Sequence, residues 1–381
     1  MTTHSTDSKS PSHPDAAADP RLQPVDDRAT LDHQLQDLLV ARGDSAPYAD
    51  AIQASNSNPV TYQQIQAVVA QDFATMDQQV FGTLNSRVKL VMAVSQHVID
   101  AGGKRMRPLI SLLCSRICDD RPSAKAMRLG AITEMLHTAT LVHDDVIDAS
   151  GMRRGKPTAN ATWDNPTAVL VGDYLIARAF NLLVEFGSLP LLKLFSDGTC
   201  DIAEGEVLQL QHQHDPEATE SDYMRIIDGK TSRLFMLAAQ GVSILHNRPE
   251  YEAAFVTFGQ HFGNAFQIID DILDFTGDSA VLGKNVGDDI AEGKPTLPLI
   301  KALEFTKGDT HDTLRLAIQT GKVADAGAII NIVQASGALE YCRDKAEHES
   351  QLARASVLTL PPSPYRQGLL DLLALAQQRL Y

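Results

Sequence analysis

The sequence predicts an all-α protein, and three observations support this fold class. From Thr61 onward, apolar residues recur three and four positions apart, which is the spacing of one face of an α-helix. Gly, Pro, Asn and Asp separate these stretches, and we find no alternating strand pattern and no repeat of roughly 20 to 50 residues. Several stretches are apolar on almost every side, which is typical of helices inside a large bundle. We therefore expect residues 61–381 to form one all-α domain.

The expected helices follow one another with short polar or Gly-containing breaks. In chain order they cover residues 61–84, 88–99, 108–118, 126–147, 168–186, 200–210, 223–245 and 251–275, followed by packing helices within about 306–381. The stretches 126–147 and 251–275 contain the polar side chains that are candidates for binding or catalysis. Both are strongly apolar along most of their length and acidic only near their ends.

Residues 1–60 differ from the rest in composition. They are rich in Ser, Asp, Pro, Ala, His and Gln, and they contain nine Asp and no Glu against four Lys or Arg. Such a segment buries too little apolar surface to offset the entropy lost on ordering. We predict an acidic, disordered extension in which only Leu31–Val40 could form a turn or two of amphipathic helix.

Composition and charge exclude several classes of protein. The chain of 381 residues has a formal net charge of −15, which argues against a general nucleic-acid binder because such proteins need a basic surface. The four cysteines are too few for a disulfide scaffold, and we expect Cys114 and Cys118 to be reduced and buried. No uninterrupted apolar run reaches the ~18 to 20 residues that span a bilayer. The N-terminus lacks the apolar core of a signal peptide, so we predict a cytoplasmic location.

Two acidic clusters of the same spacing end two of the apolar helices. They are DDVID at 144–148 and DDILD at 270–274, and a glycine follows each within three residues. The helix dipole is already negative there, and like charges four residues apart repel each other. One such cluster is explained by a solvated acidic face, whereas two identical ones indicate bound cations. Mg²⁺ prefers carboxylate oxygens and is commonly shared with substrate phosphates. We expect it between a diphosphate and the carboxylates of the two clusters, which would face each other across the bundle.

A basic turn, GGKRMRP at 102–108, provides the opposite charge. Pro108 suits the first position of the helix that follows, so Lys104 and Arg107 would flank a helix N-terminus, which is an anion site. A second basic loop directly follows the first acidic cluster and contains Arg153 and Arg154. A basic surface turn is the alternative explanation for each. Single lysines beside glycines, more typical of the surface when taken alone, are Lys230, Lys284 and Lys294.

Together these motifs resemble those of the trans-polyprenyl diphosphate synthases, with the closest likeness to bacterial octaprenyl diphosphate synthases. The matching stretches are GGKRMRP, HTATLVHDDVIDASGMRRGKPTAN, VGDYLIARAF, IAEGEVLQL, GKTSRLF, AFQIIDDILDF and LGKNVGDDIAEGKPTLPL. The resemblance covers residues 61–381 and implies an all-α isoprenoid-synthase-type bundle with a central cavity. It also implies a homodimer, and repeated condensation of isopentenyl diphosphate onto an allylic diphosphate such as farnesyl diphosphate. The product would partition to a membrane and serve as the side chain of a respiratory quinone.

The resemblance also assigns roles to individual residues. Isopentenyl diphosphate would be held by Lys104, Arg107, His137 and Arg154. The allylic diphosphate would contact Arg153, and further diphosphate-site positions are Lys230, Gln267, Lys284 and Lys294. Mg²⁺ would be bound by Asp144, Asp148, Asp270 and Asp274. The catalytic group would comprise Asp144, Asp148, Asp270, Asp271, Lys230 and Thr231, with Thr231 near the reacting carbons. Without the resemblance, His137 would be explained as a satisfied core histidine on an apolar helix.

Product length is predicted from the residues that precede the first acidic cluster. Ala139 and Thr140 lie one turn before Asp144, and Leu136 and Met135 lie about 12 Å from it along the helix. In the family, aromatic residues at the positions of Ala139 and Thr140 block the product tunnel. Their small size here favours a long product, for which we predict octaprenyl diphosphate (C40), with C45 or a shorter C20 to C35 product open. Close helix packing is the other explanation for the alanine.

Two other functions compete with this interpretation. A class I terpene cyclase shares the bundle and one DDxxD, but normally has an Asn/Ser/Glu-type second motif and lacks GGKRxRP. A non-catalytic partner subunit is expected to lose site residues, and none is missing here. Glu206 and Gln209 could line the cavity, which the sequence does not decide. The stretch 212–215 (HQHD) resembles a metal site but is more typical of an exposed turn.

Overall fold

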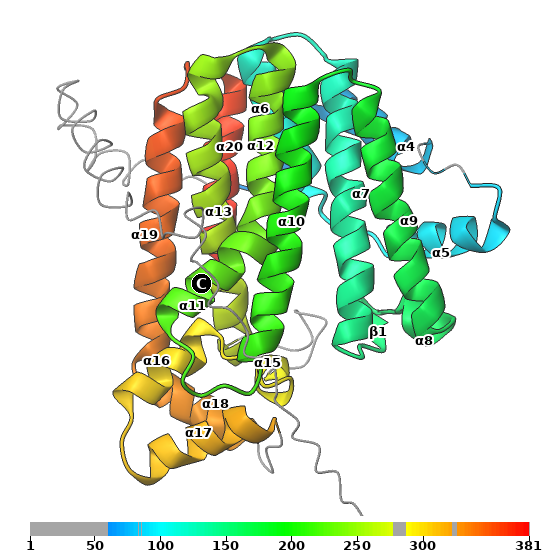
Figure 1. The fold of residues 1–381 in the computed structure, drawn as a ribbon. Coiled ribbons are helices and arrows are strands. Elements are labelled where there is room, and N and C mark those ends of the chain that lie inside the picture. The colour runs from blue at the N-terminus through cyan, green and yellow to red at the C-terminus, as the bar shows by residue number, and fades with distance from the viewer. Residues whose placement is uncertain (1–59, 83, 85, 277–286, 322–325, 381) are drawn as a thin grey trace, which may run out of the picture. The chain divides into compact units, whose positions relative to one another are not determined.

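A computed structural model describes residues 60–82, 84, 86–276, 287–321 and 326–380. All but the last residue of the predicted N-terminal extension, and also Lys284, lie outside the described residues. One compact unit spans Pro59–Tyr381. Its described residues form helices, apart from one hairpin of two-residue strands (Figure 1).

The helices of the first half lead from the start of the unit to the first acidic motif and beyond it. They are α3 (Tyr62–Ala67), α4 (Ala70–Gly82), α5 (Lys89–Asp100), α6 (Met106–Cys118), α7 (Ala124–Ile147), α8 (Ala159–Thr162), α9 (Asn165–Val184) and α10 (Leu189–His212). The hairpin lies between α7 and α8, where β1 (Met152–Arg153) pairs antiparallel with β2 (Lys156–Pro157).

The second half contains the second acidic motif and the C-terminal packing helices. Its elements are α11 (Glu220–Ile227), the π-helix η2 (Asp228–Ser232), α12 (Arg233–His246), α13 (Pro249–Thr276), α15 (Asp288–Ala291), α16 (Leu297–Phe305), α17 (Asp309–Thr320), α18 (Ala326–Ala335), α19 (Ala338–Leu358), α20 (Pro364–Gln377) and the 3₁₀-helix η3 (Gln378–Leu380).

Helix α12 lies at the centre of the bundle because it packs against α6, α7, α10 and α13. The prediction of interior helices is confirmed by α7, which is buried on nearly all sides. Its N-cap residue is Ser123, whose side chain accepts a hydrogen bond from the backbone N–H of Ala126. Aromatic side chains fill the contact between α12 and α13. Phe235 meets Phe262 edge to face at 5.1 Å, and both are fully buried.

Several details of the sequence prediction change in the structure. The helix expected at 61–84 is divided into α3 and α4, and the one expected at 200–210 begins at Leu189. Helix α6 begins at Met106, so Pro108 occupies its third position rather than its first. The third position still lies in the first turn, where backbone N–H groups have no partner within the helix, and proline is therefore tolerated there. The β1–β2 hairpin was not predicted, because strands of two residues are too short to show an alternating pattern.

Helix α9 is, among the described residues, the one helix long and apolar enough by length and composition to cross a membrane, with a mean hydropathy of 1.5. Asp173 and Arg178 interrupt it, and 39% of its most apolar window is buried within the protein. Its buried residues, including Val171 and Leu175, belong to the core, and the helix packs against α7. One face of α9 therefore belongs to the core, whereas Leu170 and Val184 on the helix are exposed.

The prediction for the cysteines is confirmed. Cys114 and Cys118 are free thiols, and both are buried in α6. Burial raises the pKa of the Cys118 thiol to about 12, so it stays protonated and unreactive at neutral pH.

Candidate active site

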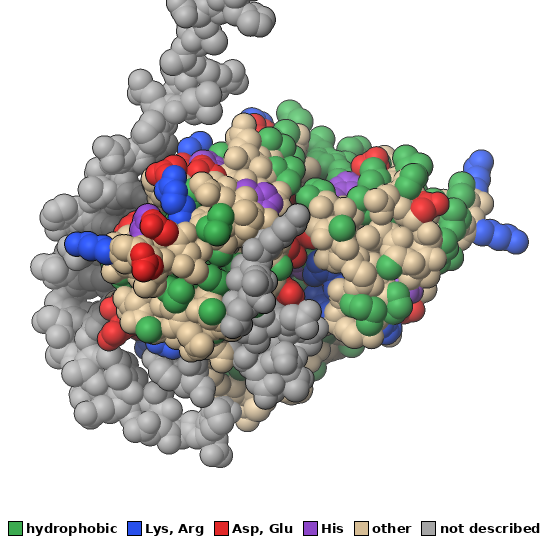
Figure 2. Space-filling view, turned by 90° about the horizontal axis from the view of Figure 1, so that it is seen from below, with side chains coloured by type: hydrophobic (Ala, Val, Ile, Leu, Met, Phe, Trp, Pro, Cys, Tyr) green, Lys and Arg blue, Asp and Glu red, His purple; other side chains and the backbone are tan. Residues whose placement is uncertain are grey.

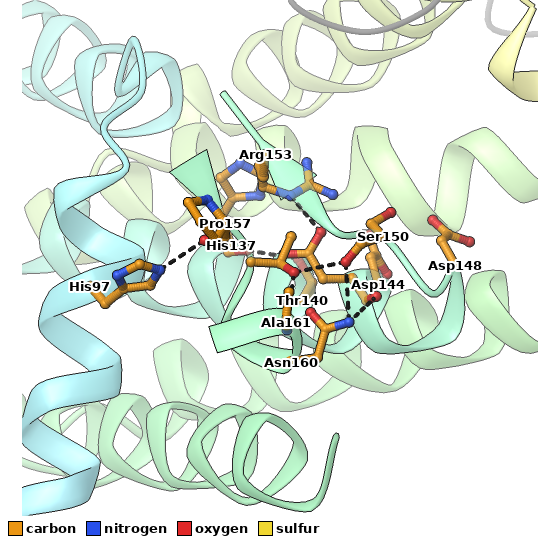
Figure 3. A network of polar contacts seen from close by, with 12 residues as sticks. His97, His137, Thr140, Asp144, Asp148, Ser150, Arg153, Pro157, Asn160 and Ala161 are labelled. Atoms are coloured by element: carbon orange, nitrogen blue, oxygen red, sulfur yellow. Dashed lines mark hydrogen bonds and ion pairs between the residues drawn. The ribbon is translucent and has the colours of Figure 1, made fainter. Parts of the chain in front are cut away.

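The first acidic motif lies at the C-terminal end of α7, as the sequence predicts. Asp144 is in the last turn of the helix and Asp148 is its C-cap residue. The carboxylate of Asp144 lies 3.7 Å from the ammonium group of Lys230, and that of Asp148 lies 3.0 Å from the ammonium group of Lys294. Figure 3 shows Asp148 beyond Asp144 along the same helix. Two cations from distant parts of the chain therefore face the motif.

These groups border a small cavity between α7, α10 and η2. Its lining residues are Asp144, Ile147, Asp148, Glu206, Gln209, Leu210, Gln213, Lys230 and Lys294. Seen from the end of the bundle at which β1 lies, acidic and basic side chains meet in a recess of the surface (Figure 2). Glu206 and Gln209, which the sequence left undecided, thus belong to the cavity.

Glu206 is an acidic member of this cavity. Its carboxylate accepts a hydrogen bond from Lys230 at 2.7 Å. Burial, together with the nearby charge of Asp144, raises the pKa of Glu206 above its usual range in spite of Lys230. A carboxyl group with a raised pKa gains most from an added positive charge, so this end of the cavity favours cations.

The second acidic motif ends α13, and its three aspartates differ in exposure. Asp270 is 29% exposed and accepts a hydrogen bond from Arg379 at 3.1 Å. Asp271 is buried and accepts hydrogen bonds from the Tyr223 hydroxyl at 2.6 Å and from the Gln267 amide at 2.8 Å. Asp274 is only 2% exposed. Asp270 is therefore the carboxylate that this motif presents most openly, whereas Asp271 occupies both of its oxygens in holding neighbouring side chains.

The π-helix η2 joins α11 to α12 and carries Lys230 and Thr231. The hydroxyl group of Thr231 donates to Gln267 at 2.8 Å, which extends the chain of hydrogen bonds through Gln267 to Asp271. The next residue, Ser232, is fully buried and donates to Asn264 at 2.6 Å. Single π-helical turns inside helices are frequent at functional sites. Here the π-helix brings Lys230 to α7 and α10 while Thr231 faces α13.

A second chain of hydrogen bonds joins α13 to α19. Asn264 donates to Glu349 of α19 at 3.0 Å, and His261 contacts the same carboxylate at 2.7 Å. No sequence motif indicated Tyr223, Asn264 or Glu349, because residues that act by holding others carry no motif of their own.

The basic turn meets the N-terminus of α6 as predicted. Arg107 places its guanidinium group 4.2 Å from the centre of the Phe235 ring, and burial lowers its pKa to about 10, so it stays charged. Its Nε is buried and has no hydrogen-bond partner among the described residues. A buried cationic donor without a partner fits an anionic ligand. The neighbouring Arg105 instead pairs with Glu134 at 2.8 Å and stabilises the turn.

His137 lies among the arginines rather than beside a carboxylate. Burial, and then the charges of Arg107, Arg154 and Arg153, lower its pKa well below the usual range. The imidazole is therefore neutral at pH 7, and it can hydrogen-bond without changing the charge of the site. The structure thus brings His137, Arg107, Arg153 and Arg154 together beside α7.

The hairpin holds the second basic loop over the end of α7. The side chain of Arg153 donates to Asp145 at 2.7 Å, and Asn160 donates to the Asp145 carbonyl at 3.1 Å (Figure 3). Lys104 in the basic turn is an exposed residue. Partial burial of its ammonium group and the charge of Arg379 lower its pKa, whereas the charge of Asp270 acts in the opposite direction. The basic turn therefore lies next to the second acidic motif.

The predicted chain-length residues lie where the helix geometry requires. Ala139, Met135 and Leu136 are buried in the bundle. Thr140 is half-buried, and its hydroxyl group donates to the carbonyl of His137 at 2.9 Å.

The carboxylates of the two motifs fit a hard divalent cation, which prefers oxygen ligands. Within the described parts of the chain, however, no group of three or more His, Cys, Asp or Glu side chains is close enough to hold a metal ion. Any ion here would need its remaining ligands from water and from a phosphate. Such a site suits a metal that arrives with its substrate.

An all-α bundle with two acidic helix ends and a cluster of cations defines a prenyl-transferring enzyme. Comparison with known proteins agrees, because the polyprenyl synthetase family model matches residues 88–335. The chain belongs to this family, and the resemblance noted from the motifs is confirmed.

Individual relatives are similar over almost their whole length. The chain is 58% identical to an all-trans-nonaprenyl-diphosphate synthase (geranyl-diphosphate specific) of Rhodobacter capsulatus, over 84% of this chain and 98% of that protein. It is 43% identical to octaprenyl diphosphate synthase of Escherichia coli, over 83% and 98%. A crystal structure of polyprenyl synthase from Caulobacter crescentus, complexed with calcium and isoprenyl diphosphate, matches with a TM-score of 0.80 and 35% identity over 84% and 98%. The predicted isoprenoid-synthase fold is thereby confirmed.

Proposed function

We propose that this protein is a Mg²⁺-dependent, long-chain trans-polyprenyl diphosphate synthase. The observation that carries the proposal is the pairing of the acidic end of α7 with the buried, unpartnered Nε of Arg107 in one helical bundle. The first can share cations with a diphosphate and the second can bind a diphosphate directly. The substrates are isopentenyl diphosphate and an allylic diphosphate, which enzymes of this family condense.

The chain's own residues bind the two diphosphates on opposite sides of α7. Lys104, Arg107 and Arg154 would grip isopentenyl diphosphate, with neutral His137 as a hydrogen-bonding neighbour. Lys230, Lys294 and Gln267 would reach the allylic diphosphate from the other side. Arg153 would contact it from the hairpin, and Thr231 would lie near the reacting carbons. Lys284 remains a predicted diphosphate contact that lies outside the described residues. The aspartates that would hold Mg²⁺ are Asp144, Asp148, Asp270 and Asp274.

When bound, Mg²⁺ would neutralise the charge that develops on the departing diphosphate. The carbon–oxygen bond of the allylic diphosphate breaks, and the double bond of isopentenyl diphosphate supplies the electrons of the new carbon–carbon bond. A proton then leaves the product, and the departing diphosphate is the base that we propose. Lys230 and Lys294 would stabilise the same charge from the protein side. The apolar surroundings of α7 must exclude water, since water would capture the allylic cation.

The product is proposed to contain eight or nine isoprene units. The proposal of a long product follows from the small side chains of Ala139 and Thr140, which favour octaprenyl diphosphate. The higher identity to a nonaprenyl synthase favours the longer product as a second candidate. Either chain would partition to a membrane and suit the side chain of a respiratory quinone. The enzyme itself is proposed to be cytoplasmic.

A homodimer is proposed from the outer faces of α9 and α10. Large apolar side chains are exposed there, at Leu170, Val184, Leu189 and Val207. Light scattering of the purified protein would measure its mass directly, and Leu170→Lys should shift a dimer toward the monomer.

One assay tests the enzymatic proposal and its competitors. The purified protein is incubated with radiolabelled isopentenyl diphosphate, Mg²⁺ and either geranyl or farnesyl diphosphate, and the products are separated by thin-layer chromatography after dephosphorylation. A long-chain synthase gives labelled polyprenols of eight or nine units. A terpene cyclase would convert the allylic diphosphate without incorporating label, and a non-catalytic subunit would give neither product. Either of these last results would overturn the proposal.

A further inference from the structure

The HQHD stretch at the end of α10 forms no metal site in the structure. Its side chains and backbone instead contact two later segments of the chain. His212 contacts Asp215 within the same stretch at 3.2 Å, whereas Gln213 and His214 face the loop before α16. In Figure 1 this end of α10 lies beside α15.

Two neighbouring carbonyl groups of that loop are held from α10. The side-chain amide of Gln213 donates to the carbonyl of Glu292 at 2.7 Å. The backbone N–H of His214 donates to the carbonyl of Gly293 at 2.8 Å. The next residue in the chain is Lys294, so both bonds fix the backbone from which this lysine extends.

The His214 ring secures the same loop by close packing. A Cβ at Gly293 would lie 2.0 Å from His214 Nδ1, and one at Gly321 would lie 2.9 Å from the ring. Both glycines have positive φ angles, so the ring fits where only glycine leaves room. His214 Nδ1 also lies 3.0 Å from the carbonyl of Ile318 near the end of α17, and it must donate there because a carbonyl only accepts.

His214 itself has φ of 64°, in the left-handed region that few residues other than glycine adopt. This conformation turns its ring back toward Gly293 and Gly321. The arrangement therefore ties α10, the loop before α16 and the end of α17 together at one side chain.

The side chain whose backbone these contacts hold is Lys294. Its ammonium group lies 3.0 Å from Asp148 and 2.6 Å from Glu292. These two carboxylates raise its pKa although burial acts in the opposite direction, so the lysine remains charged. A lysine has a long flexible side chain, and its reach to the cavity depends on where its backbone is held.

We propose that His214, with Gln213, is a positioning residue that sets Lys294 for contact with the allylic diphosphate. This inference rests on the proposed function. It predicts that loss of the His214 ring weakens binding of one substrate only, because none of the residues proposed to hold isopentenyl diphosphate belongs to this loop.

The test compares His214→Asn, Lys294→Ala and the double variant with the unchanged protein. Asparagine tolerates the left-handed backbone conformation, so the change removes the ring without new strain. We expect KM for the allylic diphosphate to rise about fivefold in His214→Asn, as a partial loss of one charge-assisted hydrogen bond. The KM for isopentenyl diphosphate and kcat should stay within about twofold. His212→Asn is the matched control from the same stretch and should leave both KM values unchanged.

The double variant decides whether His214 acts through Lys294. If it does, adding His214→Asn to Lys294→Ala costs nothing further, since the positioned group is already absent. Multiplying effects, or an unchanged allylic KM in His214→Asn, would overturn the inference. If Lys294→Ala itself binds the allylic diphosphate normally, the role proposed for Lys294 fails as well, and that result is distinct from failure at His214 alone.

Discussion

The two acidic motifs have the same spacing in the sequence and different surroundings in the bundle. Their second aspartates behave alike, because Asp145 and Asp271 are both buried and hold neighbouring side chains. Their last residues differ. Asp148 faces Lys294 at the edge of the cavity, whereas Asp274 is almost completely buried.

The difference shows that a spacing of carboxylates fixes which of them share a helix face but not which of them reach a ligand. On α7 the first and last carboxylates are both available to the cavity. On α13 the first, Asp270, is the most exposed, and it faces Arg379 from the far end of the chain. We therefore expect the motif of α7 to provide more of the metal-binding capacity.

The largest expected effect is loss of the first carboxylate of α7. Asp144→Asn keeps the shape of the side chain but removes the charge that shares a cation with the substrate. We expect kcat/KM to fall about 10³-fold, the size found when one electrostatic contact to a transition state is removed. Steady-state assays over a range of Mg²⁺ concentrations measure it. A loss of less than tenfold would contradict the assignment of Asp144.

A smaller effect is expected from Asp271, the buried second aspartate of the acidic motif of α13. Asp271→Asn disturbs the hydrogen bonds to Tyr223 and Gln267, and through Gln267 the placement of Thr231. We expect kcat to fall about 10- to 100-fold, as for residues that orient metal ligands from behind.

The Mg²⁺ concentration for half-maximal rate separates the two roles. It should be unchanged in Asp271→Asn and raised in Asp148→Asn. An increase of similar size in both variants would show that Asp271 binds the metal directly and would overturn its role in holding Tyr223 and Gln267.

The third prediction compares matched positions on the two helices. Ala139 precedes Asp144 by five residues and Ala265 precedes Asp270 by five, and both alanines are buried. Ala139→Phe should shorten the product, because a large ring would fill the space proposed for the growing chain. Ala265→Phe is the control and should leave the product length unchanged. Product chromatography measures both, and thermal unfolding confirms that each variant is folded. An unchanged product in Ala139→Phe would refute the proposed tunnel.

Much of this site could be predicted from the sequence, and the missing parts share a physical cause. The α7 cluster was predictable because Asp144, Asp148 and His137 occupy one helix at fixed spacing. Contacts such as Lys294 with Asp148 join residues 146 positions apart, and only the family resemblance indicated them. The π-helix and the support from Glu349 were not predictable, since helical periodicity carries no information about a single altered turn.

The smallest expected effect tests the hydrogen-bonded support behind α13. Burial alone would raise the pKa of Glu349, but the hydrogen bond and charge of His261, with Asn264, lower it below its usual value. A carboxyl group with a lowered pKa in the folded state stabilises that state above its unfolded pKa of about 4.3, and this contribution is lost as the pH falls through the folded value. Glu349→Gln should therefore lower the free energy of unfolding by about 1 to 2 kcal/mol at pH 7.

The pH dependence distinguishes this charge effect from a simple change of packing. The difference between Glu349→Gln and the unchanged protein should shrink as the pH falls below about 4.3 and through the lower folded pKa, because the carboxyl group then becomes neutral in both states. Glu347→Gln, an exposed position on the same helix, is the control and should have little effect at any pH. Urea unfolding at several pH values measures all three. A difference that stays constant with pH would assign the effect to packing, and the second motif would then lack the charged support that distinguishes α13 from α7.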